Sequence, residues 1–187
     1  MLYKYRSIKD FKFFVDIILN QRLFASPYFK LNDPMEGQYL YNKGELSSSL
    51  VSAIRGEKEK FRICSLSREP EHPLMWAHYA DGHRGVVIGV DVDKLKYDVR
   101  PVLYTGLPHI QGYVSSDTAK DILCHKNAVW VYEEEERVFV SKNPYIKVEV
   151  RKIILGSRNQ DKMIIEKLVD KISPNIEIVD STSDKIY

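Results

Sequence analysis

Residues 85–90 read Gly-Val-Val-Ile-Gly-Val, an apolar run that follows a turn-forming stretch. A short run of this kind is typical of a central strand that is buried on both faces. Around it the chain alternates between strand-like and helix-like patterns, with no internal repeat, low-complexity tract or linker. The sequence therefore predicts one α+β domain that spans residues 1–187.

Further elements are expected on both sides of this run. Before it, we expect a strand at 2–6, a helix started by a capping box of Ser7 and Asp10, an extended segment at 23–32, a helix at 47–60, a strand at 61–67 and a short helix at 73–80. After it, we expect strands at 100–104, 127–140, 148–155 and 176–179, and helices at 116–125 and 161–172.

Composition narrows the class of protein. With 44% hydrophobic residues in 187, the chain is long enough for a real core. Cys64 and Cys124 lack the spacing of a disulfide framework or a zinc ribbon, so a reducing cytoplasm is expected. No signal peptide or run of about 18 apolar residues is present, and no membrane partner is expected. The net charge of +2 is too diffuse to indicate a nucleic-acid face.

The most unusual local pattern is Trp-Val-Tyr-Glu-Glu-Glu-Glu-Arg-Val at residues 130–138. On a strand, Glu133, Glu135 and Arg137 would share one face, and glutamates would also occupy the other face. Because a buried carboxylate is costly unless it is paired, one face must meet water or a polar cleft. An exposed edge strand kept soluble by its charges would explain the same pattern.

Other candidate residues lie at the ends of predicted elements. Arg6 ends the first strand, and an arginine can clamp a phosphate with two hydrogen bonds. His78 and His83 flank a turn with Gly82, but they lack carboxylate or cysteine partners at metal-ligand spacing, so no metal is predicted. Cys64 is interpreted as a small buried hydrophobe.

Five ordered motifs resemble a bacterial family named Domain of Unknown Function 2971. They are LYKYRS at 2–7, NDPME at 32–36, CSLS at 64–67, LMWAHYADGHRG at 74–85 and W-x-Y-E-x-E-x-R at 130–137. The resemblance extends from residue 2 to about residue 157 and implies no activity.

The order of these elements is also similar to the ADP-ribosyltransferase superfamily. This resemblance implies a curved, mostly antiparallel split β-sheet with helices on its faces, and NAD as the substrate. Arg6 would hold a phosphate or the nicotinamide ribose, Ser65 would support the pocket, and Tyr79 would stack on nicotinamide. His78 and His83 would lie near the bound cofactor. Glu135, with Glu133 as the alternative, would bond the ribose hydroxyl.

Two functions are therefore expected as alternatives. In the first, the protein transfers ADP-ribose to a protein or nucleic acid, or hydrolyses NAD, in bacterial defence; a carboxylate would stabilise the positive charge that develops on the ribose. In the second, the same cleft binds a nucleotide or a protein without catalysis. A metal-dependent nuclease is a third possibility. The enzymatic hypothesis requires Arg6, Tyr79 and the acidic strand to meet at one pocket.

Overall fold

The computed structural model describes residues 1–111 and 115–182. In chain order the helices and strands begin with β1 (Leu2–Arg6), α1 (Phe11–Asn20), β2 (Arg22–Phe24), β3 (Ser26–Pro27), a 3₁₀ helix (Tyr28–Lys30), α2 (Ser48–Glu59), β4 (Arg62–Ser67), α3 (Pro73–Tyr79) and β5 (Val86–Asp91). They continue with β6 (Asp98–Pro101), α4 (Ser116–Ile122), a second 3₁₀ helix (Ala128–Glu133), β7 (Glu135–Val140), β8 (Tyr145–Lys147), β9 (Glu149–Leu155), α5 (Lys162–Ile172) and β10 (Glu177–Asp180).

The main sheet is open and mostly antiparallel, with the strand order β10-β9-β5-β1-β4-β7-β6 and β3 added beside β4. Among the named strands of the described residues, only β9 and β10 pair in parallel, across the helix α5. The 85–90 run forms β5, which lies between β1 and β9 and buries Val86, Val87 and Ile88 completely. The predicted α+β class and mostly antiparallel sheet are confirmed.

The sheet has a weak junction between β1 and β4. These strands share one register pair, Tyr3 with Ser67, whereas β4 and β7 share six pairs. The strands on either side of the junction therefore diverge, and side chains from both halves can meet in the space between them.

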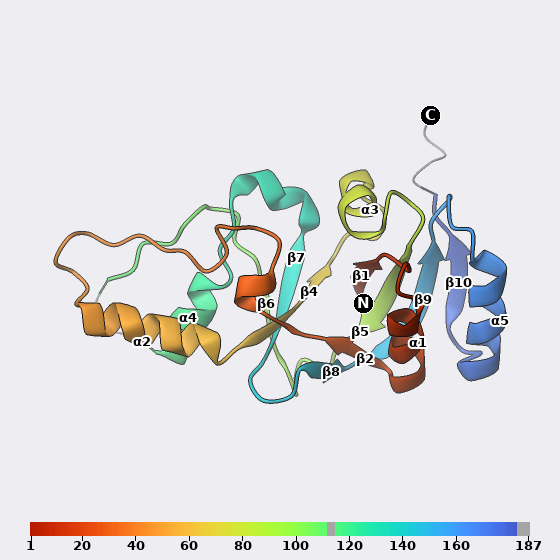
Figure 1. Cartoon of the computed structure of the whole chain (residues 1–187), viewed down its shortest axis with the longest axis horizontal. Coiled ribbons are helices and arrows are strands. Elements are labelled where there is room, and N and C mark those ends of the chain that lie inside the picture. The colour runs from red at the N-terminus through yellow and green to blue at the C-terminus, as the bar shows by residue number, and fades with distance from the viewer. Residues whose placement is uncertain (112–114, 183–187) are drawn as a thin grey trace.

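Helices cover both faces of the sheet. On one face, α1 and α5 contribute Phe14, Ile18 and Ile165 to the main core, which also holds Val86 and Ile88. On the other face, α3 packs Trp76 against Tyr5, Val87 and Ile154. Figure 1 shows α2 and α4 together at one end of the molecule and α5 beside β10 at the other.

Two predictions about helix starts and strand limits were wrong. The capping box at Ser7 does not form, because α1 begins at Phe11 with Asp10 at its N-cap position, and Ser7 instead accepts a hydrogen bond from the Lys9 backbone. The strand expected at 100–104 is β6 at Asp98–Pro101, because its pairing with β7 ends at Pro101.

The long strand expected at 127–140 is also wrong. Residues 128–133 form a 3₁₀ helix, whose first turn is capped when Asn127 Oδ1 accepts a hydrogen bond from the Val129 N–H at 3.1 Å. Glu134 then adopts a left-handed conformation with φ of 42°, and β7 begins at Glu135. Glu133 therefore does not belong to the strand that carries Glu135 and Arg137.

Candidate functional site

A cavity of about 230 Å³ lies at the junction between β1 and β4. We call it the carboxylate cavity. Its wall consists of Tyr3, Lys4, Tyr5, Lys30, Leu31, Asn32, Ser65, Leu66, Ser67, Met75, Tyr79, Glu133 and Glu135. Hydroxyl, amide, ammonium and carboxylate groups from five separate segments therefore face the same small space.

Glu133 reaches this cavity from the end of its 3₁₀ helix, and Tyr79 reaches it from the end of α3. The Tyr79 hydroxyl donates a hydrogen bond to Glu133 Oε1 at 2.5 Å and accepts one from Asn32 Nδ2 at 2.5 Å. Burial raises the pKa of Tyr79, and the hydrogen bond to Glu133 raises it further. The phenol therefore stays protonated and acts as a donor toward Glu133.

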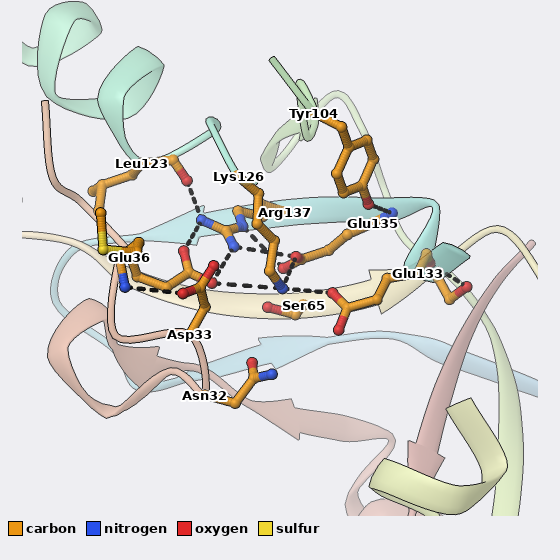
Figure 2. A network of polar contacts seen from close by, with 12 residues as sticks. Asn32, Asp33, Glu36, Ser65, Tyr104, Leu123, Lys126, Glu133, Glu135 and Arg137 are labelled. Atoms are coloured by element: carbon orange, nitrogen blue, oxygen red, sulfur yellow. Dashed lines mark hydrogen bonds and ion pairs between the residues drawn. The ribbon is translucent and has the colours of Figure 1, made fainter. Parts of the chain in front are cut away.

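Lys126, which does not line the cavity, joins the two glutamates (Figure 2). Its Nζ lies 2.5 Å from Glu133 Oε2, 3.3 Å from Glu135 Oε2 and 3.6 Å from Glu36 Oε1. Burial alone lowers the pKa of Lys126, but the charges of Glu135 and Glu133 outweigh it and raise the pKa. Lys126 is therefore a fixed cation, 1% exposed, that orients both carboxylates.

Arg137 forms the second cation of this network and has no exposed side-chain surface. Its Nε donates to Glu135 Oε1 at 2.9 Å, and its Nη2 donates to Glu36 Oε1 at 2.7 Å. Nη1 donates to the Leu123 carbonyl oxygen. The guanidinium thus ties β7 to the loop of Glu36 and to the end of α4.

These partners keep Glu135 ionised. Burial raises the pKa of Glu135, but the charges of Arg137 and Lys126 and hydrogen bonds from Arg137 and Ser65 outweigh it, so the pKa falls to about 2. The Glu135 backbone N–H donates to the Tyr104 hydroxyl at 2.7 Å, which fixes the start of β7.

The cluster does not balance its formal charges. Glu36, Glu133 and Glu135 contribute three negative charges, whereas Lys126 and Arg137 contribute two positive charges, which leaves a net charge of −1. Burial also raises the pKa of Glu36, which does not line the cavity as Glu133 and Glu135 do. The carboxylate side of the cavity therefore favours hydrogen-bond donors, while Lys4 and Lys30 offer cations on the cavity's other walls.

Four of the predicted site residues meet here: Ser65, Tyr79, Glu133 and Glu135 all line the carboxylate cavity. The Tyr79 hydroxyl donates a hydrogen bond to Glu133. The stacking of the Tyr79 ring on nicotinamide, which the resemblance implies, stays a prediction.

Arg6 does not join them, and the expected convergence is not found. Tyr3 pairs with Ser67 and Ser67 with Glu135, so these three share one face, whereas Arg6 is three residues beyond Tyr3 and points to the opposite face. Arg6 instead lines a neighbouring cavity of about 350 Å³ with Lys4, Arg22 and Ser26, which we call the arginine cavity. Lys4 lines both cavities.

His78 and His83 also lie apart from the carboxylate cavity. His78 is exposed at the end of α3, with its ring centroid 6.1 Å from that of Tyr79. His83 stacks on Trp76 at 4.7 Å, and its backbone carbonyl accepts a hydrogen bond from the Arg158 N–H. His83 therefore supports the turn between α3 and β5. Within residues 1–111 and 115–182, no group of three His, Cys, Asp or Glu side chains could hold a metal ion.

Part of the chain matches a known family. Residues 75–106 match the family model described as Protein of unknown function (DUF2971). This segment contains most of α3, all of β5 and all of β6, and it carries Tyr79, whereas Ser65, Glu133 and Glu135 lie outside it. The match supports the resemblance over this segment. No curated protein and no solved structure matched the chain. None of the helices in the described part of the chain is long and apolar enough to span a membrane.

Sequence reasoning missed several residues of the site. Asn32 and Glu36 begin and end the NDPME motif but had no assigned role, although two polar side chains at a turn were a usable signal. Lys126 is one lysine among many in the sequence, and only the fold brings it to Glu133 and Glu135.

Proposed function

We propose that the protein binds a nucleotide in the carboxylate cavity. The observation that carries this proposal is the arrangement of Glu133 and Tyr79 on one wall and Lys4 on another wall of the same cavity. A ribose offers hydroxyl donors to the first pair, and a phosphate offers negative charge to the lysine.

The size of the cavity limits what it holds. At about 230 Å³ it lies below the usual range for a whole drug-sized ligand, so it suits a nucleoside rather than a dinucleotide. A longer ligand would continue past Lys4 into the arginine cavity, where Arg6 carries no ion pair with any described residue. In this arrangement Arg6 keeps a phosphate-binding role, in the second cavity instead of the first.

Ligand-induced thermal stabilisation tests this proposal. The probes are AMP, ADP-ribose and NAD, and a ligand at about 100 times its Kd should stabilise the fold by about 2.7 kcal/mol, a Tm increase of about 5–10 °C. Tyr79→Phe removes the hydroxyl between Asn32 and Glu133 and should reduce the shift. Tyr41→Phe is the matched control, because Tyr41 is 43% exposed and does not line the cavity. No shift with any of the three probes would refute the proposal.

Cleavage of the nicotinamide–ribose bond of NAD is the second candidate, in a form that does not need Arg6 in the carboxylate cavity, and the state of Glu135 favours it. Glu135 lines the cavity and stays ionised because its pKa is about 2. A fixed carboxylate beside the ribose would stabilise the oxocarbenium-like transition state more than bound NAD. Glu133 would hold a ribose hydroxyl in this scheme, and the acceptor of ADP-ribose would be water or a macromolecule.

The test of NAD cleavage is the release of nicotinamide, and it needs a variant that leaves the fold intact. Glu135→Gln would weaken the ion pairs of Glu135 with Arg137 and Lys126, so it would perturb the fold as well as any catalysis. Glu133→Gln keeps Glu135 beside both cations and should reduce nicotinamide release, measured by chromatography. Glu166→Gln on the exposed surface of α5 is the control and should leave release unchanged. Release that persists in Glu133→Gln would remove Glu133 from the mechanism, and no release by the unmodified protein would refute cleavage.

A further inference from the structure

A third hollow, of about 750 Å³, lies between the β7–β8 turn, β2 and the start of β6. We call it the basic groove. Five cationic side chains line it: Arg22, Lys96, Lys120, Lys142 and Lys147. Asp98 is its one acidic lining residue, so the formal charge of the groove is +5 − 1, or +4. The whole chain carries only +2, so the fold concentrates positive charge that is scattered in the sequence.

Several of these cations are available to a partner. Lys96 and Lys142 are exposed and form no ion pair with any residue of 1–111 or 115–182. Lys147 donates to the Asn20 carbonyl oxygen at 3.0 Å and has no carboxylate partner in the same ranges. Arg22 and Lys120 are paired with acids, so they contribute less to binding. The free charge therefore lies mainly along Lys96, Lys142 and Lys147.

Aromatic rings alternate with these cations. The Arg22 guanidinium lies 3.9 Å from the ring centroid of Tyr145. Lys96 Nζ lies 5.4 Å from the centroid of Tyr97, and Lys120 Nζ lies 5.2 Å from that of Phe61. Single-stranded nucleic acid is bound by this combination, since phosphates pair with cations and unpaired bases stack on rings. An acidic peptide would use the charges but would bring no bases to stack on the rings.

We propose that the basic groove binds single-stranded nucleic acid. The groove shares Arg22 and Tyr145 with the arginine cavity, which in turn shares Lys4 with the carboxylate cavity. The three hollows are therefore neighbours along the sheet. Binding to the groove does not depend on the proposed nucleotide site, because no residue of the carboxylate cavity lines the groove.

Fluorescence anisotropy with labelled oligonucleotides of about 12 nucleotides tests this proposal. Oligothymidylate and oligouridylate are the probes, and the expected Kd lies at about 1–100 µM. If four phosphates are contacted, log Kobs should fall with log salt with a slope of about −2.8, which is a loss of about 50-fold between about 50 and about 200 mM salt. A preference for either probe identifies DNA or RNA as the source, and both results support the groove.

Two double variants, which change the net charge by the same amount, test whether the nucleic acid binds at the groove. Lys96→Glu combined with Lys142→Glu should weaken binding at least about tenfold and reduce the salt slope by about 1.4. Lys43→Glu combined with Lys167→Glu is the control, because both residues are exposed and lie outside the groove. Tyr79→Phe should leave strand binding unchanged, which separates this test from that of the nucleotide site.

Three outcomes would overturn the proposal: no binding of either strand at low salt, equal loss in the two double variants, or tighter binding of polyglutamate than of either strand.

Discussion

Replacing Arg137 with methionine tests how the site is held in place. Arg137 is fully buried and bonds Glu36, Glu135 and the Leu123 carbonyl oxygen. Methionine fills much of the same volume but carries no charge, so the formal charge of the cluster changes from −1 to −2. Removing one partner of a buried ion pair costs about 3–5 kcal/mol, because the other partner stays buried without compensation.

This loss is large relative to the stability of a domain. A free energy of unfolding of about 5–15 kcal/mol would fall by about a fifth or more, and Tm would fall by about 6–20 °C. The assay is urea and thermal unfolding at neutral pH. Arg151→Met is the matched control, because the Arg151 side chain is 52% exposed and its pairs with Asp91 and Glu149 are solvated. The control should cost about 1 kcal/mol or less.

The variant should also respond differently to acid. Arg137 is the strongest of the influences that lower the pKa of Glu135, so Glu135 should accept a proton at higher pH in Arg137→Met. The stability difference between the unmodified protein and Arg137→Met should therefore shrink as the pH falls. If Arg137→Met and Arg151→Met differ by less than about 1 kcal/mol at neutral pH, the ion network does not organise the site.

Three more predictions concern the fold around the site. The pKa of Glu135 is lowered from 4.5 to about 2, so the ionised carboxylate should contribute about 3 kcal/mol to the free energy of unfolding. In acid unfolding curves this contribution should be complete above pH 4.5 and should disappear as the pH falls toward 2. A flat stability profile between these pH values would contradict this. Gly85→Ala should destabilise the protein by about 3 kcal/mol in urea unfolding, since the added Cβ would overlap the Arg6 carbonyl oxygen. Gly56→Ala should stabilise the protein by about 0.5–1 kcal/mol, because Gly56 lies in α2 with open space around it. Equal effects of the two variants would be inconsistent with the packing described. Cys64 and Cys124 are buried with raised thiol pKa values, so neither should react with a thiol reagent until the protein unfolds, and rapid labelling of the native state would oppose their burial.

The strands and helices with a clear hydrophobic period were predictable from the sequence. The β5 run, the amphipathic α5 and the proline-started α3 appear close to their expected limits, since periodicity reports directly on burial.

The acidic segment was predictable only in part. Glu135 and Arg137 share a face of β7 as expected, but Glu133 lies on a 3₁₀ helix, because local capping by Asn127 overrides the strand pattern. The glutamates on both faces of the assumed strand were the signal that something other than an ordinary strand was present.

The partners of the site could not be predicted from local patterns. Arg137 Nη2 bonds Glu36, which lies 101 positions earlier in the chain, and Tyr79 bonds Glu133, 54 positions later. Such contacts depend on the order of the strands and on the weak junction between β1 and β4, and no single segment of the sequence specifies either of these. For the same reason, the basic groove could not be predicted from the sequence, because its cationic residues are scattered along the chain.

Chemical-shift mapping with ADP-ribose tests the central claim most directly, namely that the carboxylate cavity is the ligand site. The account predicts saturable changes in the backbone resonances of Ser65, Tyr79 and Glu133, which Tyr79→Phe should weaken and Tyr41→Phe should preserve. Saturable changes confined to other parts of the protein, or no changes at millimolar ligand, would contradict it.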